Sequence, residues 1–137
     1  MADWVTKDGR CFGCGQGNES GLRLRYRRTG EGSVEAEYSV PRHFMGADGV
    51  VHGGIQATLL DEVMGLAVHA TLAAEDHKIV TAELNVRYRK AAPIEVPLVI
   101  RATLTRVDGS NLFLRSEIVD AAGDVLTEAD ARWRRLR

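Results

Sequence analysis

Length, composition and charge already exclude several classes of protein. The chain has 137 residues, of which 45% are hydrophobic, and a formal net charge of −1, so its size suits one domain with a single core and its charge argues against a protein built to neutralise nucleic-acid phosphates. Because the sequence has no run of about 18 apolar residues and no secretory stretch, we expect a cytoplasmic protein whose partners include no nucleic acid and no membrane.

Residues 1–21 form an expected lead-in segment, because CFGCGQGNESG is rich in glycine and has no periodicity. Both cysteines of the chain, Cys11 and Cys14, lie there with C-x-x-C spacing. A zinc site needs four ligands, and no histidine has the spacing that would complete one. A redox pair is typical of a strand-to-helix turn in a parallel α/β unit, which this pattern does not resemble. The sequence favours a tight turn packed on the domain and predicts no metal site.

Two strands are expected next, at residues 22–28 and 33–40. LRLRYRR alternates strictly, so that its leucines and tyrosine share one face and its arginines the other. SVEAEYSV alternates again after the turn TGEG, which predicts a hairpin. Residues 41–51 then begin with a proline and contain two glycines, which predicts a loop.

A long helix is expected from about Gly53 to Ala74. The segment contains no proline, and its apolar residues cover nearly every helical angle. Such a helix is enclosed on most sides. At 1.5 Å per residue it spans on the order of 30 Å, the width of a small sheet.

Four further strands are expected after the helix, at residues 78–90, 96–107, 111–120 and 125–136, with short turns between the last three. The order of elements predicts an α+β protein in which residues 22–137 form one domain, with an antiparallel sheet curled around one helix. One helix covers only part of such a sheet. We therefore expect a dimer joined through an edge strand.

The helix carries an acid, Asp61, on an otherwise apolar face. Residues three, four and seven positions away share a helical face, so Gly54, Met64 and Gly65 lie on the same side as this carboxylate. The small residues leave room beside it. One interpretation is a general base or nucleophile that faces a groove, and the other is a carboxylate bound by a neighbouring backbone group or arginine.

The helix opens with His52, Gly53 and Gly54. Helix N-termini leave N–H groups unpaired, and glycines allow a ligand oxygen to approach them. Taken one at a time, these residues are better explained by structure alone: turn geometry for the glycines, and a helix cap or core contact for His52. Donors at the helix start together with Asp61 two turns later are the components of an acyl-transfer site.

The stretch HGGIQATLLDEVMG resembles the signature of hotdog-fold acyl-CoA thioesterases, in the phenylacetate-pathway-like branch where H-G-G opens the central helix and an Asp follows nine residues after the His. CFGCGQGNESGLRL is similar to the lead-in of one subgroup. The resemblance covers about residues 11–134. It implies the hotdog fold, an antiparallel sheet of about six strands wrapped around one long central helix. It also implies an enzyme, a thioester hydrolase acting on a small or medium, aromatic or aliphatic acyl-CoA as a homodimer or dimer of dimers.

The resemblance also assigns catalytic roles. Asp61 would activate water or attack the thioester carbon, and the backbone N–H of Gly53 would polarise the thioester carbonyl. His52 would orient the loop or the thioester. Thr81 would position water from the neighbouring subunit, although strict alternation places it on the strand face opposite Leu84.

One position departs from the family pattern. Several relatives have an Asn six residues before the His, and this chain has Gly46 there. Polarisation of the carbonyl then depends on fewer donors, and Gln56 is the expected helper. Gly54 and Met64 complete the expected substrate contacts on the helix, since a glycine admits the ligand and methionine adapts to acyl groups of different shape.

Arg87, Arg89 and Lys90 are the expected contacts for the phosphates of coenzyme A, because arginine binds phosphate through paired donors and the resemblance places coenzyme A near this strand end. The alternative for each is a solvated strand face. Coenzyme A enters as part of the substrate, so no separate cofactor is expected.

Two rival functions remain at this point. The first is a non-catalytic acyl-CoA binding or sensing domain, which has no need of a carboxylate such as Asp61 in an acyl groove. The second is a hotdog dehydratase or hydratase, which needs a catalytic His and acid in a different arrangement. The acyl group itself is not specified by the sequence.

Overall fold

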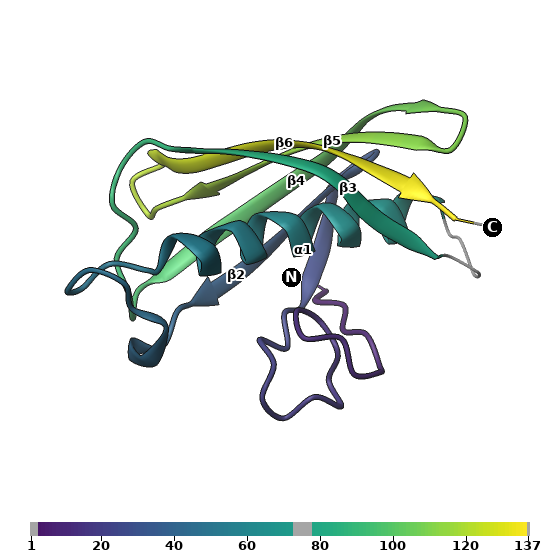
Figure 1. The fold of residues 1–137 in the computed structure, drawn as a ribbon. Helices are drawn as coiled ribbons and strands as arrows, with labels where there is room; N and C mark the ends of the chain where they lie inside the picture. Colours follow the sequence, from purple (N-terminus) through teal and green to yellow (C-terminus); the bar gives the residue numbers. More distant parts are fainter. Residues whose placement is uncertain (1–2, 73–77, 137) are drawn as a thin grey trace.

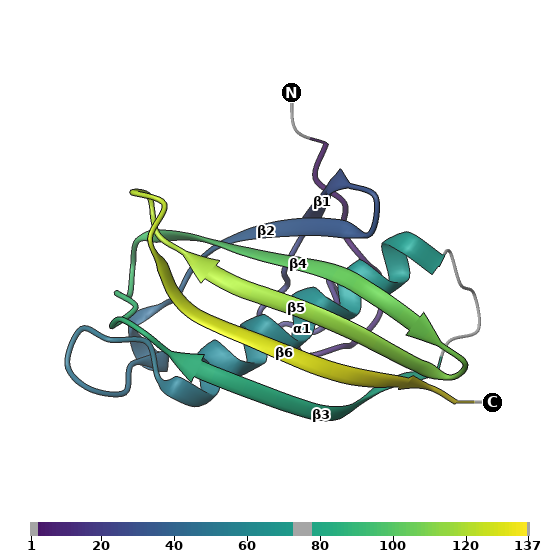
Figure 2. The same cartoon turned by 90° about the horizontal axis from the view of Figure 1, so that it is seen from above.

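The computed structural model describes residues 3–72 and 78–136, and within them one sheet packs against one α-helix (Figure 1). In chain order the elements are β1 (Tyr26–Gly30), β2 (Ser33–Ser39), the short 3-10 helix η1 (Arg42–Phe44), α1 (Gly53–Leu72), β3 (Ile79–Tyr88), β4 (Pro97–Asp108), β5 (Asn111–Val119) and β6 (Val125–Arg135). The strands are antiparallel in the order β1-β2-β4-β5-β6-β3. Figure 2 shows α1 crossing beneath this sheet. The expected α+β architecture is confirmed.

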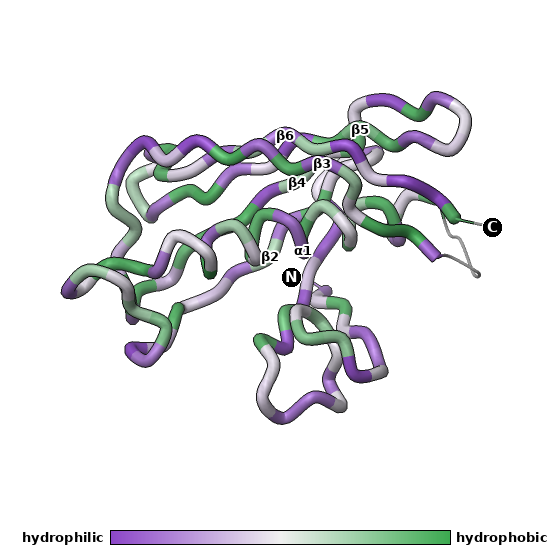
Figure 3. Tube along the Cα trace, viewed as in Figure 1, coloured by the Kyte–Doolittle hydropathy of each residue, from purple (hydrophilic) through white to green (hydrophobic). Residues whose placement is uncertain are grey.

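The core lies between α1 and the sheet. The middle of the helix is buried all round, which explains why its apolar residues follow no single stripe: Leu59, Leu60, Val63, Met64 and Leu66 have no exposed surface. Hydrophobic and hydrophilic positions alternate along the strands (Figure 3), as expected for a sheet with one buried face. Ala74, the expected end of the helix, lies outside the described residues.

The first strand begins later than expected. Leu22 and Leu24 are buried on the predicted face together with Tyr26. However, their backbone N–H groups bond to the carbonyls of Phe12 and Gly13 in the lead-in, at 2.8 and 2.9 Å. Residues 22–25 therefore tie the lead-in to the domain, and β1 pairs with β2 only from Tyr26 onward.

Strand β3 contains a bulge that changes which of its side chains face α1. Its pairing with β6 shifts between Thr81 and Glu83, so Ala82 is an extra residue. An extra residue in a strand breaks the two-residue alternation. Thr81 therefore lies on the helix-facing side together with Leu84 and Tyr88, and the expectation that Thr81 and Leu84 face opposite ways was wrong.

Among the described residues β3 pairs only with β6, so it forms an edge of the sheet. Its other edge presents ten residues of backbone, and most of its side chains are exposed. The opposite edge, β1, is partly covered, since Val5 of the lead-in bridges to Tyr26. No helix in the described part of the chain combines the length and the apolar character needed to cross a membrane.

Gly65 allows the helix and β6 to approach closely. A Cβ atom at this position would lie 2.7 Å from Cη2 of Trp133, whose side chain is 8% exposed. We expect Gly65→Ala to destabilise the protein by about 1–3 kcal/mol through overpacking, despite the better helix propensity of alanine. Urea unfolding measures this loss. The same Gly65→Ala change should cost less free energy of unfolding in a Trp133→Phe protein, where the ring is smaller. An equal cost in both backgrounds would contradict the steric explanation.

Candidate active site

The start of α1 has one backbone N–H for which the described residues supply no partner. The N–H of Gly54 donates to Nδ1 of His52 at 2.9 Å, and the N–H groups of Ile55 and Gln56 bond to the carbonyl of His52 at 3.0 Å. The N–H of Gly53 has no hydrogen-bond partner among the described residues. The Gly53 N–H is therefore available to a ligand oxygen, and its role in polarising a carbonyl stays a prediction. The Gly54 N–H is not available to a ligand in this arrangement, because His52 caps it; the expected substrate contact at Gly54 stays a prediction.

Tyr88 holds this helix start from the end of β3. Its hydroxyl donates to the carbonyl oxygen of Gly53 at 2.7 Å, and its side chain is 53% exposed. A Cβ at Gly53 would lie 3.5 Å from the same hydroxyl. The sequence places Tyr88 on the apolar strand face but does not predict this contact. The contact joins the end of β3 to the start of α1, which are 35 positions apart in the chain.

Asp61 is half-buried and accepts a hydrogen bond from Oγ1 of Thr81 at 2.7 Å. Burial raises the pKa of the Asp61 carboxyl above its ordinary value, the Thr81 hydrogen bond lowers it, and the neighbouring Glu62 carboxylate raises it. Within the described residues Asp61 forms no ion pair. The carboxylate is therefore positioned without being neutralised, which is what a base or nucleophile requires.

The contact between Thr81 and Asp61 lies within one chain. Contact with Asp61 therefore needs no neighbouring subunit, and the expected role of Thr81 in positioning water stays a prediction. The bulge at Ala82 is the reason for the contact, since it turns Thr81 toward α1.

Gly53 and Asp61 are far apart in one chain. Eight residues separate them, and at 1.5 Å per residue they lie about 12 Å apart along the helix axis. A thioester carbonyl is much smaller than this distance. One chain therefore cannot hold the carbonyl oxygen at Gly53 while Asp61 acts on the same carbon.

Two of the residues expected to contact substrate are in the core. Gln56 is 4% exposed; its amide donates to the carbonyl of Val51 at 2.9 Å and its oxygen accepts from the Thr127 hydroxyl. Met64 has no exposed surface. Both expectations are corrected: Gln56 satisfies buried polar groups and is not free to polarise a carbonyl, and Met64 packs between α1 and the sheet.

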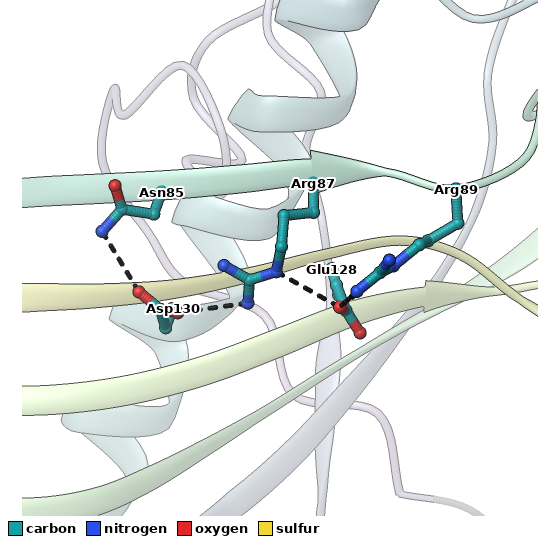
Figure 4. Close-up of polar contacts among 5 residues, drawn as sticks. All are labelled: Asn85, Arg87, Arg89, Glu128 and Asp130. Carbon is teal, nitrogen blue, oxygen red and sulfur yellow. Dashed lines mark hydrogen bonds and ion pairs between the residues drawn. The ribbon is translucent and has the colours of Figure 1, made fainter.

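The three cations expected to bind coenzyme A have carboxylate partners (Figure 4 shows the arginines). Arg87 contacts Glu128 at 3.2 Å and Asp130 at 3.1 Å, Arg89 contacts Glu128 at 2.5 Å, and Lys90 contacts Asp124 at 3.3 Å. Hydrogen bonds from Arg89 and Arg87 lower the pKa of Glu128. A phosphate must compete with these exposed pairs, and the role in substrate binding stays a prediction.

Two open hollows, of about 430 and 410 Å³, do not coincide with Asp61. Arg87, Arg101 and Glu128 line the first hollow and Arg115 lines both, and these side chains alternate with the buried ones. The hollows therefore lie on the sheet face away from α1. We therefore assign the candidate active site to Asp61 and Gly53 on α1 and not to these hollows.

The second acid of the pair, Glu62, contacts the lead-in. The Cys11 thiol donates to its Oε1 at 3.5 Å. Cys14 is 6% exposed, and burial raises the pKa of its thiol, as does the Glu62 carboxylate. The sequence analysis predicted a packed turn here, which is confirmed, but it did not identify Glu62 as the residue on which the turn packs.

The chain is similar in sequence to known thioesterases. A family model described as the thioesterase superfamily matches residues 48–127, more than half of the chain. The Mus musculus protein named acyl-coenzyme A thioesterase THEM4 is 34% identical over 95 residues, which are 69% of this chain and 39% of that protein. The Rattus norvegicus protein of the same name is 32% identical with the same coverage. The chain thus spans about two fifths of the length of these curated relatives.

Solved structures show the same fold. Zebra fish thioesterase superfamily member 2 aligns with a TM-score of 0.74 and 21% identity, over 88% of this chain and 89% of that one. A phenylacetic acid degradation-related protein from Ralstonia eutropha JMP134 aligns with a TM-score of 0.75 and 27% identity, over 82% and 85%. These likenesses confirm the hotdog architecture. Together with the matched family model, they show that the chain belongs to the thioesterase superfamily.

Proposed function

We propose that this protein hydrolyses the thioester of a small or medium acyl-CoA, aromatic or aliphatic, to the free acid and coenzyme A. The observation that carries the proposal is Asp61, a half-buried carboxylate held by Thr81 and not neutralised by any described cation. The unpaired N–H of Gly53 supplies the complementary donor. The names of the THEM4 relatives support coenzyme A as the carrier.

We further propose that the working site is shared by two chains. Gly53 and Asp61 of one chain are about 12 Å apart, so each needs its counterpart from another copy. The two chains can associate through the unpaired edge of β3, because an exposed strand edge pairs readily with a second strand. A homodimer or dimer of dimers built on this edge is isologous.

The residues of β3 support a particular register. Thr81, beside Asp61, and Tyr88, beside Gly53, lie near opposite ends of the strand. In an antiparallel pair of β3 strands centred on Asn85, with Ala82 left unpaired as it is against β6, Thr81 of one chain faces Tyr88 of the partner subunit. That register brings Asp61 of one chain toward Gly53 of the partner subunit, so that a dimer contains two equivalent sites.

In this site the thioester carbonyl oxygen accepts a hydrogen bond from the Gly53 N–H, where negative charge develops during attack. Asp61 takes a proton from water as the new C–O bond forms, the C–S bond breaks, and the thiolate of coenzyme A leaves and is protonated. Direct attack by Asp61, followed by hydrolysis of the anhydride, is the alternative route. Gln56 is buried and Gly46 carries no side chain, so neither assists, and slow turnover follows.

A thiol-release screen tests the function. The purified protein is offered acyl-CoAs of increasing length and of aromatic character, and free thiol is measured with and without enzyme. We expect release from at least one of them. If every ester is stable while coenzyme A still binds, the protein is an acyl-CoA binding or sensing domain instead.

The hydroxyl of Thr81 should matter for turnover more than for binding. Thr81→Val removes the hydrogen bond to Asp61, and a hydrogen bond to a charged group contributes about 1.5–3 kcal/mol. We expect kcat to fall at least about tenfold with little change in KM. Steady-state kinetics measure both, and Thr81→Ser, which keeps the hydroxyl, should remain close to wild type. A Thr81→Val variant with the kcat of wild type would contradict a role for this hydrogen bond in turnover.

Three further assignments stay proposals. These are the cytoplasm as the compartment, the phenylacetate-pathway-like branch as the position within the superfamily, and Arg87, Arg89 and Lys90 as contacts for coenzyme A.

A further inference from the structure

Three metal-ligating side chains meet where the lead-in packs against α1. Cys11 and Cys14 come from the lead-in and Glu62 from the helix, and one ligand atom from each lies within 4.8 Å of the others. The three residues are separated by up to 51 positions in the chain. This juxtaposition is therefore created by the fold and not by local sequence.

The spacing of one pair of these atoms matches a tetrahedral metal site. With a zinc–sulfur distance of about 2.3 Å and a zinc–oxygen distance of about 2.0 Å, tetrahedral angles place sulfur and oxygen about 3.5 Å apart. Sγ of Cys11 and Oε1 of Glu62 are 3.5 Å apart. Little movement is needed for one ion to touch both atoms.

The loop between the cysteines is closed tightly around the carboxylate. A Cβ at Gly13 would lie 2.2 Å from Oε1 of Glu62, and a Cβ at Gly15 would lie 2.4 Å from the backbone nitrogen of Cys11. The N–H of Gly15 bonds to the carbonyl of Cys11 at 2.9 Å, which fixes the turn. The glycines thus let the C-x-x-C turn approach Glu62 more closely than any other residues would allow.

We propose that Cys11, Cys14 and Glu62 bind one zinc ion that fastens the lead-in to α1. Two thiolates and a carboxylate are ligands that zinc accepts, and thiolates favour it over magnesium or calcium. Three protein ligands leave the fourth position to water. In the sequence, no histidine has the spacing to complete a zinc site, and this argued against zinc. In the structure, Glu62 of α1 provides the additional ligand.

Metal binding to the whole chain tests the proposal without any measurement of activity. The protein is stripped with a chelator under reducing conditions and titrated with zinc by calorimetry, and with cobalt to follow thiolate-to-metal charge-transfer absorption. We expect one ion per chain and the absorption of tetrahedral thiolate ligation. Glu62→Gln should weaken binding at least about tenfold, and Cys14→Ser should remove most of the charge-transfer signal.

A matched control and a fold check keep the result clear. Glu19→Gln removes an exposed lead-in acid outside the cluster and should bind zinc like wild type. Circular dichroism verifies that each variant is folded. If Cys14→Ser is unfolded, the zinc affinity of the isosteric Glu62→Gln variant decides the test. The proposal is overturned if reduced wild type binds no stoichiometric zinc, if Glu62→Gln binds it with unchanged affinity, or if mass spectrometry finds a Cys11–Cys14 disulfide as the form the purified protein keeps.

Discussion

Replacing Asp61 with asparagine is expected to lower kcat for thioester hydrolysis by at least about a hundredfold, the size of effect typical when a positioned base or nucleophile is removed. Asparagine keeps the shape of the side chain and can still accept the Thr81 hydrogen bond. The loss would therefore report the missing negative charge and not a collapsed site. Steady-state kinetics on the best ester from the screen measure it.

The matched control is Glu37→Gln, which removes a carboxylate from an exposed position on β2, far from Asp61 in the chain. It should leave kcat and KM unchanged. Asp61→Ala should lose at least as much activity as Asp61→Asn. Full activity in both Asp61 variants would show that another group performs the chemistry and would remove the basis of the proposed mechanism.

Two inactive variants should restore activity to one another. Gly53→Pro removes the N–H expected to polarise the carbonyl, and proline is well tolerated at the first position of a helix. Loss of one such donor typically lowers kcat by about 10²–10³. In a heterodimer with an Asp61→Asn chain, one shared site carries both defects and the other carries none. An equal mixture of chains contains about one half heterodimers, so about a quarter of wild-type activity should return.

The comparison distinguishes shared from separate sites. If donor and acid of the same chain worked together, every site in every dimer would be defective and no activity would return. The two variants are co-expressed with different tags so that heterodimers can be isolated and assayed alone, where half of wild-type activity is expected. Gly53→Ala, which keeps the N–H and fits beside Tyr88, is the control for side-chain bulk.

The elements of the fold could be predicted because each has a strong local signal. Apolar residues alternate along the strands, and the long segment after Gly53 lacks proline and is apolar on every side. The position of Asp61 relative to the helix start also follows from helix geometry alone. All of these depend on residues that are near one another in the chain.

The features that the sequence did not reveal depend on contacts between distant segments. Gln56 looks like a polar residue on a helix flank, but β6 supplies Thr127 to bury it. Glu62 has a use only because the lead-in returns to it. Arg87 and Arg89 carry the charge that binds phosphate, yet the register of β3 on β6 places acids beside them. Neither hydrophobic periodicity nor motif spacing predicts such contacts between distant residues.

The extra residue at Ala82 has a consequence for both ends of the helix. Thr81 and Tyr88 are seven positions apart, and in a regular strand an odd separation directs two side chains to opposite faces. Such a strand could reach either Asp61 or Gly53, but never both. One inserted amino acid lets a single β-strand serve an acid and a donor at once, and deleting it would turn the threonine away from the carboxylate while leaving the tyrosine in place.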